Sequence, residues 1–356
     1  EGHLIMARAI MRYYCKNMDT FIFSLIQVYG NREAGTMAAQ LAQRGLDMRI
    51  FFDKMAAAKM ASAGGAAAYP GLMQLIICTV TFWISFFHKQ GHTHDEIPSE
   101  ALVQKVSDDI ERKIGEGIGF GKKEAAGINF EALEEKITGT IPEFSEGDEL
   151  LRAVASAVAE AGPWNASMNM VARKSGLSKS SLYSHFKNKQ DMMAQLFLTE
   201  CERIIGFAEQ SKGFSSVPAE QFYLVIFAIG SYLRSRPQIL VAVDWLRTRK
   251  LDLGIKESPR FFRCLSGISL YRGGGDLDPA ELEYHGERYA QWMIFLIVNI
   301  LMNGNNREKG TAKPGWWNIN FRDVNPTEAG IMAVTNESFR ILFKFMLSGM
   351  KGVTNE

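Results

Sequence analysis

The chain has 356 residues, 47% of them hydrophobic, so it is too long for one ordinary core and too apolar for an intrinsically disordered protein. Its formal net charge of +1 excludes a uniformly basic or acidic surface, although a balanced total can hide a local charged patch. The four cysteines are far apart and form no CxxC motif, so neither a zinc site nor a disulfide framework is predicted, and a reducing cytoplasm fits best.

The first part of the chain is predicted to be helical throughout. Apolar residues recur at helical spacing, and alternating strand patterns bounded by turns are rare, which favours an all-α fold. The predicted helices of this first series are residues 3–16, 18–30, 34–44, 46–62, 71–90 and 98–115. The chain starts without Met and inside the first of these helices, so we expect that further sequence precedes it.

Residues 71–88 are uncharged over about the minimum length of a membrane-spanning helix. However, they include Gln74, Thr79, Thr81 and Ser85, and no second candidate membrane span accompanies them. Helices that are apolar on most sides also occur at the centre of large helical assemblies. We therefore expect a buried helix here, and no membrane partner.

A glycine-rich stretch, residues 115–130, follows the first series and is predicted to interrupt regular structure. Its glycines have neither the GxGxxG nor the P-loop spacing, and no strand precedes them, so a phosphate-binding loop is disfavoured. We place a linker at residues 121–146, with a short helix around residues 131–137.

The rest of the chain is a second helical series that resembles the first. Its predicted helices are residues 149–161, 167–174, 178–185, 188–211, 218–235, 237–250, 256–269, 279–304 and 328–350. Three pairs of segments resemble each other, namely 20–48 and 221–249, 71–91 and 287–306, and 101–119 and 333–352. This predicts a tandem duplication in which only the second copy has an extra block, residues 147–193.

The extra block begins with two predicted helices and a tight turn. The first helix is closed by Gly162 and has one apolar face. That face consists of Leu150, Leu151, Val154, Ala157, Val158 and Ala161. Ser167 is a good N-cap for the second helix, whose buried side is Val171 and Ala172. Gly176, four residues after Ala172, suits a left-handed turn.

The third helix of the block is predicted to begin after Ser178 and to face Leu182 and Phe186 inward. A small residue, a turn glycine four positions later and an apolar anchor six after that give the spacing of a helix-turn-helix. The first of its two helices supports the second, which enters the major groove of DNA. From Ser167 to Lys189 there are five Lys or Arg residues and no acid, which also favours an anionic duplex as partner.

The predicted DNA contacts lie on the outward face of this third helix and beside it. Lys can bond guanine acceptors, and Ser hydroxyls can bond base edges or phosphates. Side chains near the helix end, and the positive N-terminal end of the next helix, can hold the sugar-phosphate backbone. The candidate DNA-binding residues are Ser167, Lys179, Ser180, Ser181, Tyr183, Ser184, His185 and Lys189.

The block closely resembles the DNA-binding signature of the TetR (tetracycline repressor) family. The residues that match it in order are Gly162, Ser167, Val171, Ala172, Gly176, Leu177, Tyr183, Phe186 and Lys189. The sequence departs from the pattern at Pro163 and Trp164, which are expected to follow the first helix. The resemblance implies an all-helical one-component regulator. Such a protein has a three-helix DNA-binding domain and a larger helical domain that binds a small molecule and dimerises through its last two long helices.

On that resemblance, the chain contains two TetR-like regulatory domains. The predicted domains are a first regulatory domain at 1–120, the linker at 121–146, the helix-turn-helix domain at 147–193 and a second regulatory domain at 194–356. Since the family is implied to homodimerise, one chain is expected to hold both halves of the dimer. Helices 71–90, 98–115, 284–304 and 328–350 would then form a four-helix bundle. An upstream DNA-binding block is favoured over its loss from the first copy, and a homodimer of the whole chain is the alternative.

The expected mechanism is release of a repressor from its operator by a small, apolar effector. Met-rich and aromatic helices fill the regulatory domains, and no charged cluster suggests a phosphate ligand. The candidate ligand-binding residues are Phe227, Trp245, Phe262, Trp292 and Phe295, each of which also suits a core position.

No catalytic residues are predicted, because the histidines are scattered and no nucleophile motif or framed carboxylate pair is visible. The run from His92 to Glu96 has metal-ligating side chains, but it lies in a predicted loop without a Cys or a distant His partner. Neither an enzyme, a cofactor nor a metal site is therefore expected. The alternative function is a helical small-molecule or lipid-binding or interaction protein whose helix-turn-helix is not its main function.

Overall fold

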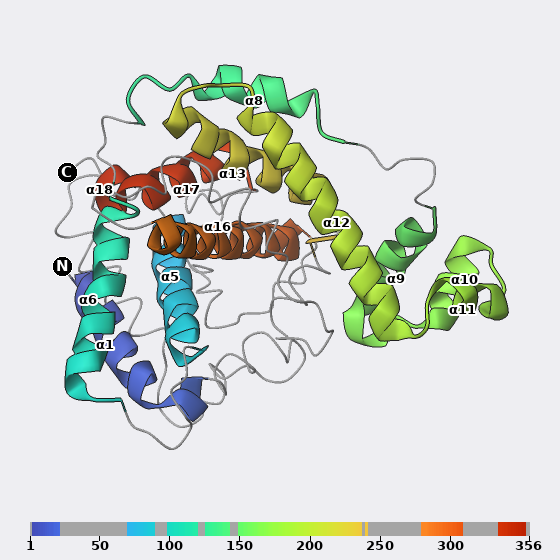
Figure 1. Ribbon diagram of the computed structural model, residues 1–356, viewed down its shortest axis with the longest axis horizontal. Coiled ribbons are helices and arrows are strands. Elements are labelled where there is room, and N and C mark those ends of the chain that lie inside the picture. The colour runs from blue at the N-terminus through green and yellow to red at the C-terminus, as the bar shows by residue number, and fades with distance from the viewer. Residues whose placement is uncertain are drawn as a thin grey trace. The chain divides into compact units, whose positions relative to one another are not determined.

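The computed structural model describes residues 2–21, 70–89, 98–119, 125–142, 149–236, 239–240, 279–308 and 334–353. All regular structure in these residues is helical, which confirms the predicted all-α fold (Figure 1). The chain divides into two compact units, one of Glu1–Lys122 with Asn303–Glu356 and the other of Lys123–Met302. The helices predicted at 34–44, 46–62 and 256–269 lie outside the described residues, as do most of those predicted at 18–30 and 237–250. The predicted domain boundaries and the duplication stay predictions.

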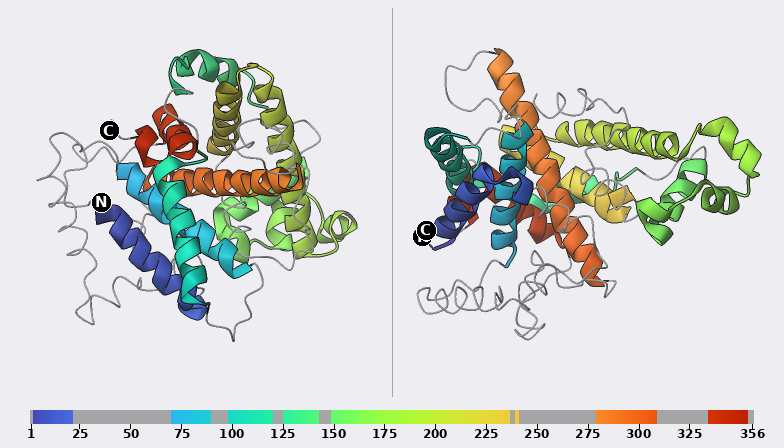
Figure 2. Two further views of the ribbon diagram at one scale, coloured as in Figure 1. Left: turned by 60° about the vertical axis from the view of Figure 1, so that its left-hand side comes forward. Right: turned by 90° about the horizontal axis from the view of Figure 1, so that it is seen from below.

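The first unit joins helices from the two ends of the sequence. Its helices are α1 (Gly2–Lys16), α5 (Pro70–Lys89), α6 (Glu100–Glu116), α17 (Asn336–Ser348) and α18 (Met350–Val353). Helix α1 packs against α5 and α6, while α17 and α18 pack against α6, and α17 also touches α5 (Figures 1 and 2). The last helices of the chain therefore complete a core that the first helices begin.

Helix α5 coincides with the uncharged segment that raised the question of a membrane span. Leu75, Ile76 and Ile84 on this helix are almost completely inaccessible to solvent, and the helix contacts α1, α6 and α17. Among the described residues, no helix combines the length and the apolarity needed to cross a bilayer. The side chains of α5 therefore contribute to the core of the first unit, as expected.

The C-terminal ends of α6 and α17 meet backbone to backbone. Gly117 ends α6 with φ 62° and ψ −131°, and Gly349 ends α17 with φ 61° and ψ −151°. A Cβ on Gly117 would lie 2.3 Å from the carbonyl oxygen of Met346, and the Ile118 amide donates to that oxygen at 2.8 Å. Both conformation and space therefore require glycine at these two positions.

Helices α6 and α17 also bury corresponding positions when Gly117 is aligned with Gly349. The buried residues of α6 include Ser107, Ile110, Lys113 and Ile114, and those of α17 include Phe339, Leu342, Phe345 and Met346 in the same spacing. Four buried positions thus coincide in the two helices, which also share one type of C-terminal end, while α17 buries Phe343, Leu347 and Ser348 in addition.

The start of the last helix was predicted too early. Thr335 is extended, with φ −96° and ψ 172°, and α17 begins only at Asn336. The Ser338 hydroxyl accepts a hydrogen bond from the Thr335 amide at 3.3 Å, and Ser and Thr favour helix starts over helix interiors for this reason. Residues 328–333 lie outside the described residues.

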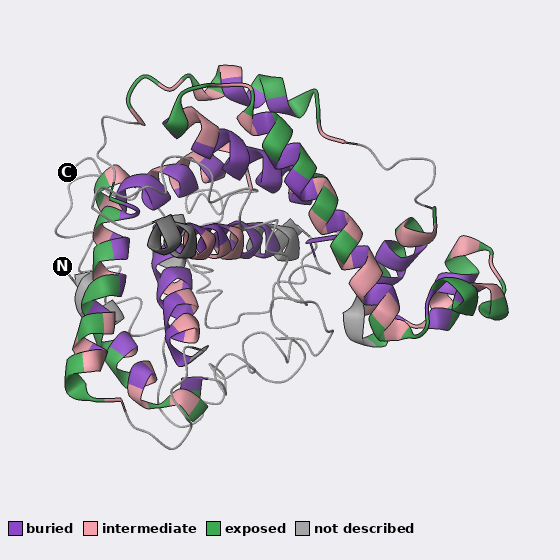
Figure 3. Ribbon diagram, in the orientation of Figure 1, coloured by how far each residue is buried: buried purple, intermediate pink, exposed green. Residues whose placement is uncertain are grey.

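The second unit is arranged around a central buried helix. Its helices are α8 (Phe130–Thr138), α9 (Glu149–Asn165), α10 (Met168–Ser175), α11 (Lys179–His185), α12 (Lys189–Lys212), α13 (Pro218–Ser235) and the part of α16 (Pro279–Glu308) up to Met302. Every residue of α13 from Phe222 to Leu233 is buried, as the continuous purple in Figure 3 shows. Helix α12 packs along α13, and α8 packs against it as well. The short helix expected around 131–137 is thus present as a packed element.

Candidate DNA-binding interface

Helix α9 supports the interface through the predicted apolar face. Val154, Ala157 and Val158 are completely buried, and α9 packs against both α10 and α12. The prediction that Gly162 closes this helix is wrong, because α9 continues through Pro163 to Asn165. Proline lacks an N–H and therefore cannot bond the carbonyl four residues earlier, but in the last turn this loss leaves the helix before it intact.

The turn between α10 and α11 has the predicted geometry. The Ser167 hydroxyl caps α10 by accepting from the Met170 amide at 3.3 Å, and Val171 and Ala172 are buried. Gly176 is left-handed with φ 69°, and its N–H bonds the Ala172 carbonyl, as does the Leu177 N–H at 3.1 Å. A helix end of this kind directs the chain into the second helix of a helix-turn-helix.

Helix α11 is short but fixed at both ends. The Ser178 hydroxyl accepts from the Ser181 amide at 3.0 Å, which satisfies an N–H at the start of the helix. Leu182 and Phe186 are buried, and the Gln195 amide of α12 donates to the His185 carbonyl at 3.4 Å. The inward residues therefore hold the opposite face toward solvent, as the sequence predicted.

The outward face of α11 carries most of the predicted DNA-binding side chains. Lys179, Ser180, Tyr183, Ser184 and His185 are exposed, and Tyr183 shows 48% of its surface to solvent. Ser181 and Ser167 are half-buried. The Ser184 hydroxyl donates to the Ser181 carbonyl at 2.6 Å, so its oxygen faces a DNA partner as an acceptor only.

The start of α12 adds a capped helix N-terminus beside α11. The Asn188 side chain accepts from the Asp191 amide at 2.8 Å, and the Asp191 carboxylate accepts from the Lys187 amide at 2.8 Å. That backbone hydrogen bond, followed by the one from Gln195, lowers the pKa of Asp191. Lys189 is half-buried, and burial lowers the pKa of its ammonium group.

Three further cations between Ser167 and Lys189 do not belong to the predicted contact set. Arg173 and Lys187 are exposed, and their exposure is a signal that the helix periodicity could have supplied. Lys174 instead pairs with Glu160 of α9, with its Nζ 2.6 Å from a carboxylate oxygen. The hydrogen bond from Lys174, followed by its charge, lowers the pKa of Glu160. The basic density of the sequence therefore overstates the charge that is available to DNA.

The predicted ligand-binding residues are only partly described. Phe227 on α13 and Trp292 on α16 are completely buried, whereas Phe295 is half-buried. Trp245 and Phe262 lie outside the described residues, so their role stays a prediction.

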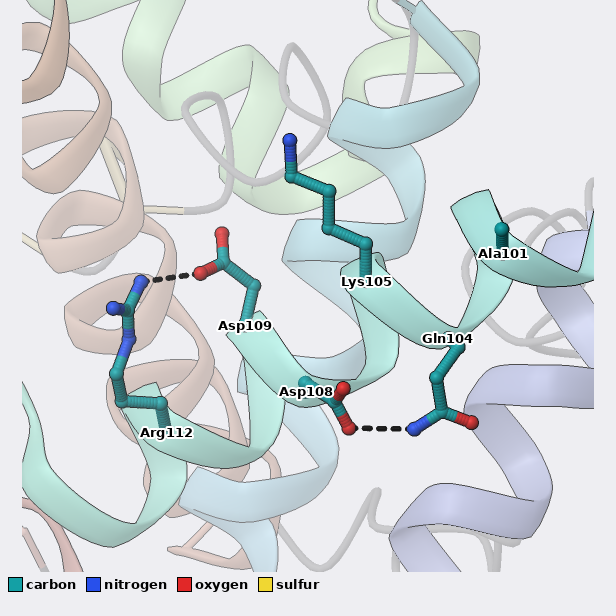
Figure 4. Close-up of a pocket in the computed structure, with 6 residues that line it drawn as sticks. All are labelled: Ala101, Gln104, Lys105, Asp108, Asp109 and Arg112. Carbon is teal, nitrogen blue, oxygen red and sulfur yellow. Dashed lines mark hydrogen bonds and ion pairs between the residues drawn. The ribbon is translucent and has the colours of Figure 1, made fainter.

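A surface depression of about 570 Å³ lies on α6 and contains none of these aromatic residues. It is lined by Ala101, Gln104, Lys105, Asp108, Asp109 and Arg112 (Figure 4). Gln104 donates to Asp108 at 2.6 Å, and Arg112 pairs with Asp109. The lining is mostly polar and comes from a single helix, which does not match an apolar effector pocket.

The run from His92 to Glu96 also lies outside the described residues. Within the described part of the chain, no three His, Cys, Asp or Glu side chains are placed together as potential metal ligands.

Comparison with known proteins finds a family model that matches the helix-turn-helix block. Residues 150–196 match the family model described as "Bacterial regulatory proteins, tetR family". No curated protein shows a significant match to the chain. The solved structure of the fatty acid degradation regulator FadR from Bacillus halodurans is similar with a TM-score of 0.40 and 13% identity, over 59% of this chain and 98% of that one. A likeness of that size establishes neither the fold nor a ligand. The matched residues, 150–196, contain the helix-turn-helix formed by α10 and α11, so this segment is similar to the DNA-binding domain of tetR-family regulatory proteins.

Proposed function

We propose that the protein represses transcription by binding an operator through α11 and that a small effector releases it. The observation that carries this proposal is the two-faced character of α11. Leu182 and Phe186 anchor one face, whereas Lys179, Ser180 and Tyr183 are presented to solvent on the other. A recognition helix needs this arrangement, because its base-reading side chains must enter the groove from a fixed backbone.

Two kinds of contact are expected from this surface. Lys179 and Ser180, near the start of α11, suit hydrogen bonds with base edges in the major groove. Tyr183, His185 and Lys189, together with the capped N-terminus of α12, suit phosphate oxygens. Lys187 is an exposed addition to the phosphate-binding group. The first kind would provide sequence specificity and the second affinity and register.

The effector is proposed to act through α12. This helix runs without a break from Lys189 to Lys212, and it contacts α9 of the DNA-binding domain as well as α13. A ligand that binds the regulatory helices can therefore shift the DNA-binding domain, provided that it binds the released state more tightly. The abundance of aromatic side chains around α13 and α16 favours an apolar molecule, with Phe295 as the described candidate that is not fully buried.

One chain is proposed to contain both halves of the bundle through which single-copy relatives would dimerise. The support is the equivalence of α6 and α17, which bury corresponding positions and end at Gly117 and Gly349 in the same backbone conformation. Equivalent faces in contact are the mark of a two-fold interface. The alternative is a homodimer of the whole chain.

Selection of bound duplexes from a random DNA pool, performed with the full-length protein at two salt concentrations, tests the proposed function. Enrichment of one sequence with a salt-dependent affinity would support a regulator. A two-part site with unequal halves would indicate two different DNA-binding domains, whereas a palindrome would indicate two copies of the 147–193 domain. Recovery of no preferred sequence would overturn the proposal and favour a helical small-molecule-binding or interaction protein.

A further inference from the structure

Helix α13 forms two buried hydrogen bonds of the same chemistry with two different helices. The Tyr232 hydroxyl donates to Glu200 of α12 at 2.7 Å, and the Tyr223 hydroxyl donates to Glu134 of α8 at 2.5 Å. All four side chains are buried. The Tyr232 pair joins α13 to the helix that continues directly from the DNA-binding domain, α12, whereas the Tyr223 pair joins α13 to α8.

Glu200 is only 1% exposed, so its carboxylate needs hydrogen-bond partners within the protein in place of water. Besides the Tyr232 hydroxyl, Arg203 one turn later on α12 donates to it at 2.7 Å. Burial, followed by the charge of Glu200, raises the pKa of Tyr232, so that its hydroxyl keeps the proton that it donates. Removal of one partner from a buried carboxylate leaves an unsatisfied charge, which is costly.

Tyr232 is also in contact with a second anchor, Arg236, which is the residue that follows α13. The Arg236 guanidinium carbon lies 3.9 Å from the centre of the Tyr232 ring, which is a cation–π distance. Arg236 is buried and donates to the Pro142 carbonyl. Arg236 is the C-cap of α13, so the two side chains meet where that helix ends.

These contacts reach both chain connections of the DNA-binding domain. The upstream connection runs from Pro142 to the start of α9 at Glu149, and the downstream connection is α12 with Glu200. Arg236 bonds Pro142, where the first connection begins, and Tyr232 bonds Glu200 on the second. The bond to Glu200 restricts how α12, which continues directly from the DNA-binding domain, can rotate on the rest of the second unit.

We propose that Tyr232 and Arg236, here called the α13 anchor, are positioning residues that set the placement of the DNA-binding domain. The expected effect on DNA binding rests on the proposed function. The restraint on the position of the domain is independent of that function. A domain whose placement is fixed beforehand loses less freedom when two recognition helices must meet two half-sites together. The α13 anchor would therefore matter for a two-part site and not for a single half-site.

The test compares Tyr232→Phe with Tyr223→Phe in the full-length protein. Each change removes one hydroxyl from a buried Tyr–Glu pair on α13, so both are expected to lower stability similarly. We expect Tyr232→Phe to weaken binding of the selected two-part duplex about tenfold, which corresponds to about 1.4 kcal/mol, while binding of a duplex with one half-site stays unchanged. Tyr223→Phe should leave both affinities unchanged. Equal effects of the two variants on the two-part duplex, or equal loss on both duplexes for Tyr232→Phe, would overturn the proposal.

Hydrogen–deuterium exchange provides a readout that does not depend on DNA. Tyr232→Phe should raise exchange in residues 189–200, and Tyr223→Phe should raise it in residues 130–138 instead. Glu200→Gln, which keeps an acceptor oxygen, should raise exchange less than Tyr232→Phe and serves if that variant fails to fold. If the wild-type protein selects no DNA, the proposed function fails. The exchange pattern still shows whether Tyr232 restrains α12. Unchanged exchange in residues 189–200 in both Tyr232→Phe and Glu200→Gln would contradict it.

Discussion

Gly117 and Gly349 lie against each other where α6 and α17 end, so close that a Cβ on Gly117 would be 2.7 Å from the backbone nitrogen of Gly349. Correspondingly, a Cβ on Gly349 would be 2.3 Å from the backbone nitrogen of Glu116 at the end of α6. The contact is approximately reciprocal, which is the arrangement that the proposed pairing of the two halves predicts. It joins positions that are far apart in the sequence.

Replacement of Gly349 by Ala should destabilise the protein by on the order of 3 kcal/mol or more, since the new side chain combines a strained φ with a backbone clash. Denaturant unfolding of the full-length protein measures this. Gly115→Ala is a matched control in the same region, because its Cβ would meet nothing within 4 Å. This variant should be neutral or stabilising by up to about 1 kcal/mol, as expected for glycine inside a helix. Equal stability of Gly349→Ala and wild type would show that the two helices do not meet in this way.

Removal of the acidic partner of Lys174 should strengthen DNA binding. Glu160→Gln releases the Lys174 ammonium from its ion pair, so that it can reach a phosphate. The slope of log affinity against log salt should then become steeper by about one unit. Glu209→Gln, which removes an exposed acid outside the DNA-binding domain, controls for net charge. A slope that is the same in all three proteins would place Lys174 away from the DNA.

The same pair predicts a pH effect on folding. The pKa of Glu160 is lowered in the folded protein, so the pair stabilises the fold above the ordinary carboxyl pKa. That contribution disappears as the pH falls through the lowered pKa. At neutral pH, wild type should therefore have a slightly larger free energy of unfolding than Glu160→Gln. In strong acid, the two proteins should have the same free energy of unfolding.

The helix-turn-helix could be predicted from the sequence because its determinants are local. Ser167 and Ser178 cap helices that begin at the next residue, and Gly176 has the left-handed φ that its place in the motif requires. Leu182 and Phe186 are four residues apart and therefore share one face. Each of these signals lies within a few residues of the structure that it determines.

Contacts between distant residues could not be predicted in the same way. Gly117 was expected only to interrupt a helix, yet it also admits the backbone of α17. The Lys174–Glu160 pair depends on how α10 packs against α9, and the bond between Tyr232 and Glu200 depends on how α12 packs along α13. Helical periodicity identifies buried faces but not the partner of each face.

A pair of serine variants separates folding from recognition on α11. Ser178→Ala removes the cap that accepts from the Ser181 amide and should cost about 1 kcal/mol of stability. Ser180→Ala should leave stability within about 0.5 kcal/mol of wild type, because Ser180 is exposed and does not cap the helix. We expect it instead to weaken binding of the selected duplex. Thermal unfolding and a DNA titration of both variants test this, and loss of stability without loss of DNA affinity in Ser180→Ala would remove it from the interface.

Two lysine variants should distinguish base reading from phosphate binding. Lys179→Ala should lower both affinity and the discrimination between selected and random duplexes, whereas Lys189→Ala should weaken binding to all duplexes alike and reduce the salt slope by about one unit. Lys105→Ala, on the exposed face of α6, removes one charge outside the DNA-binding domain and should change neither quantity. If Lys179→Ala retains full discrimination, α11 does not read bases through this side chain.

The mass of the protein in solution should be that of one chain. If α6 and α17 already pair within the molecule, the bundle face is occupied and leaves no equivalent surface for a second copy. Sedimentation at micromolar concentration measures this directly. Gly349→Ala separates the two helix ends and should expose apolar residues such as Phe339 and Leu342, so this variant should self-associate if it remains folded. A stable wild-type dimer would contradict pairing within one chain, but it would leave the assignment of the DNA-binding domain intact, because a homodimer also brings two copies of α11 to DNA.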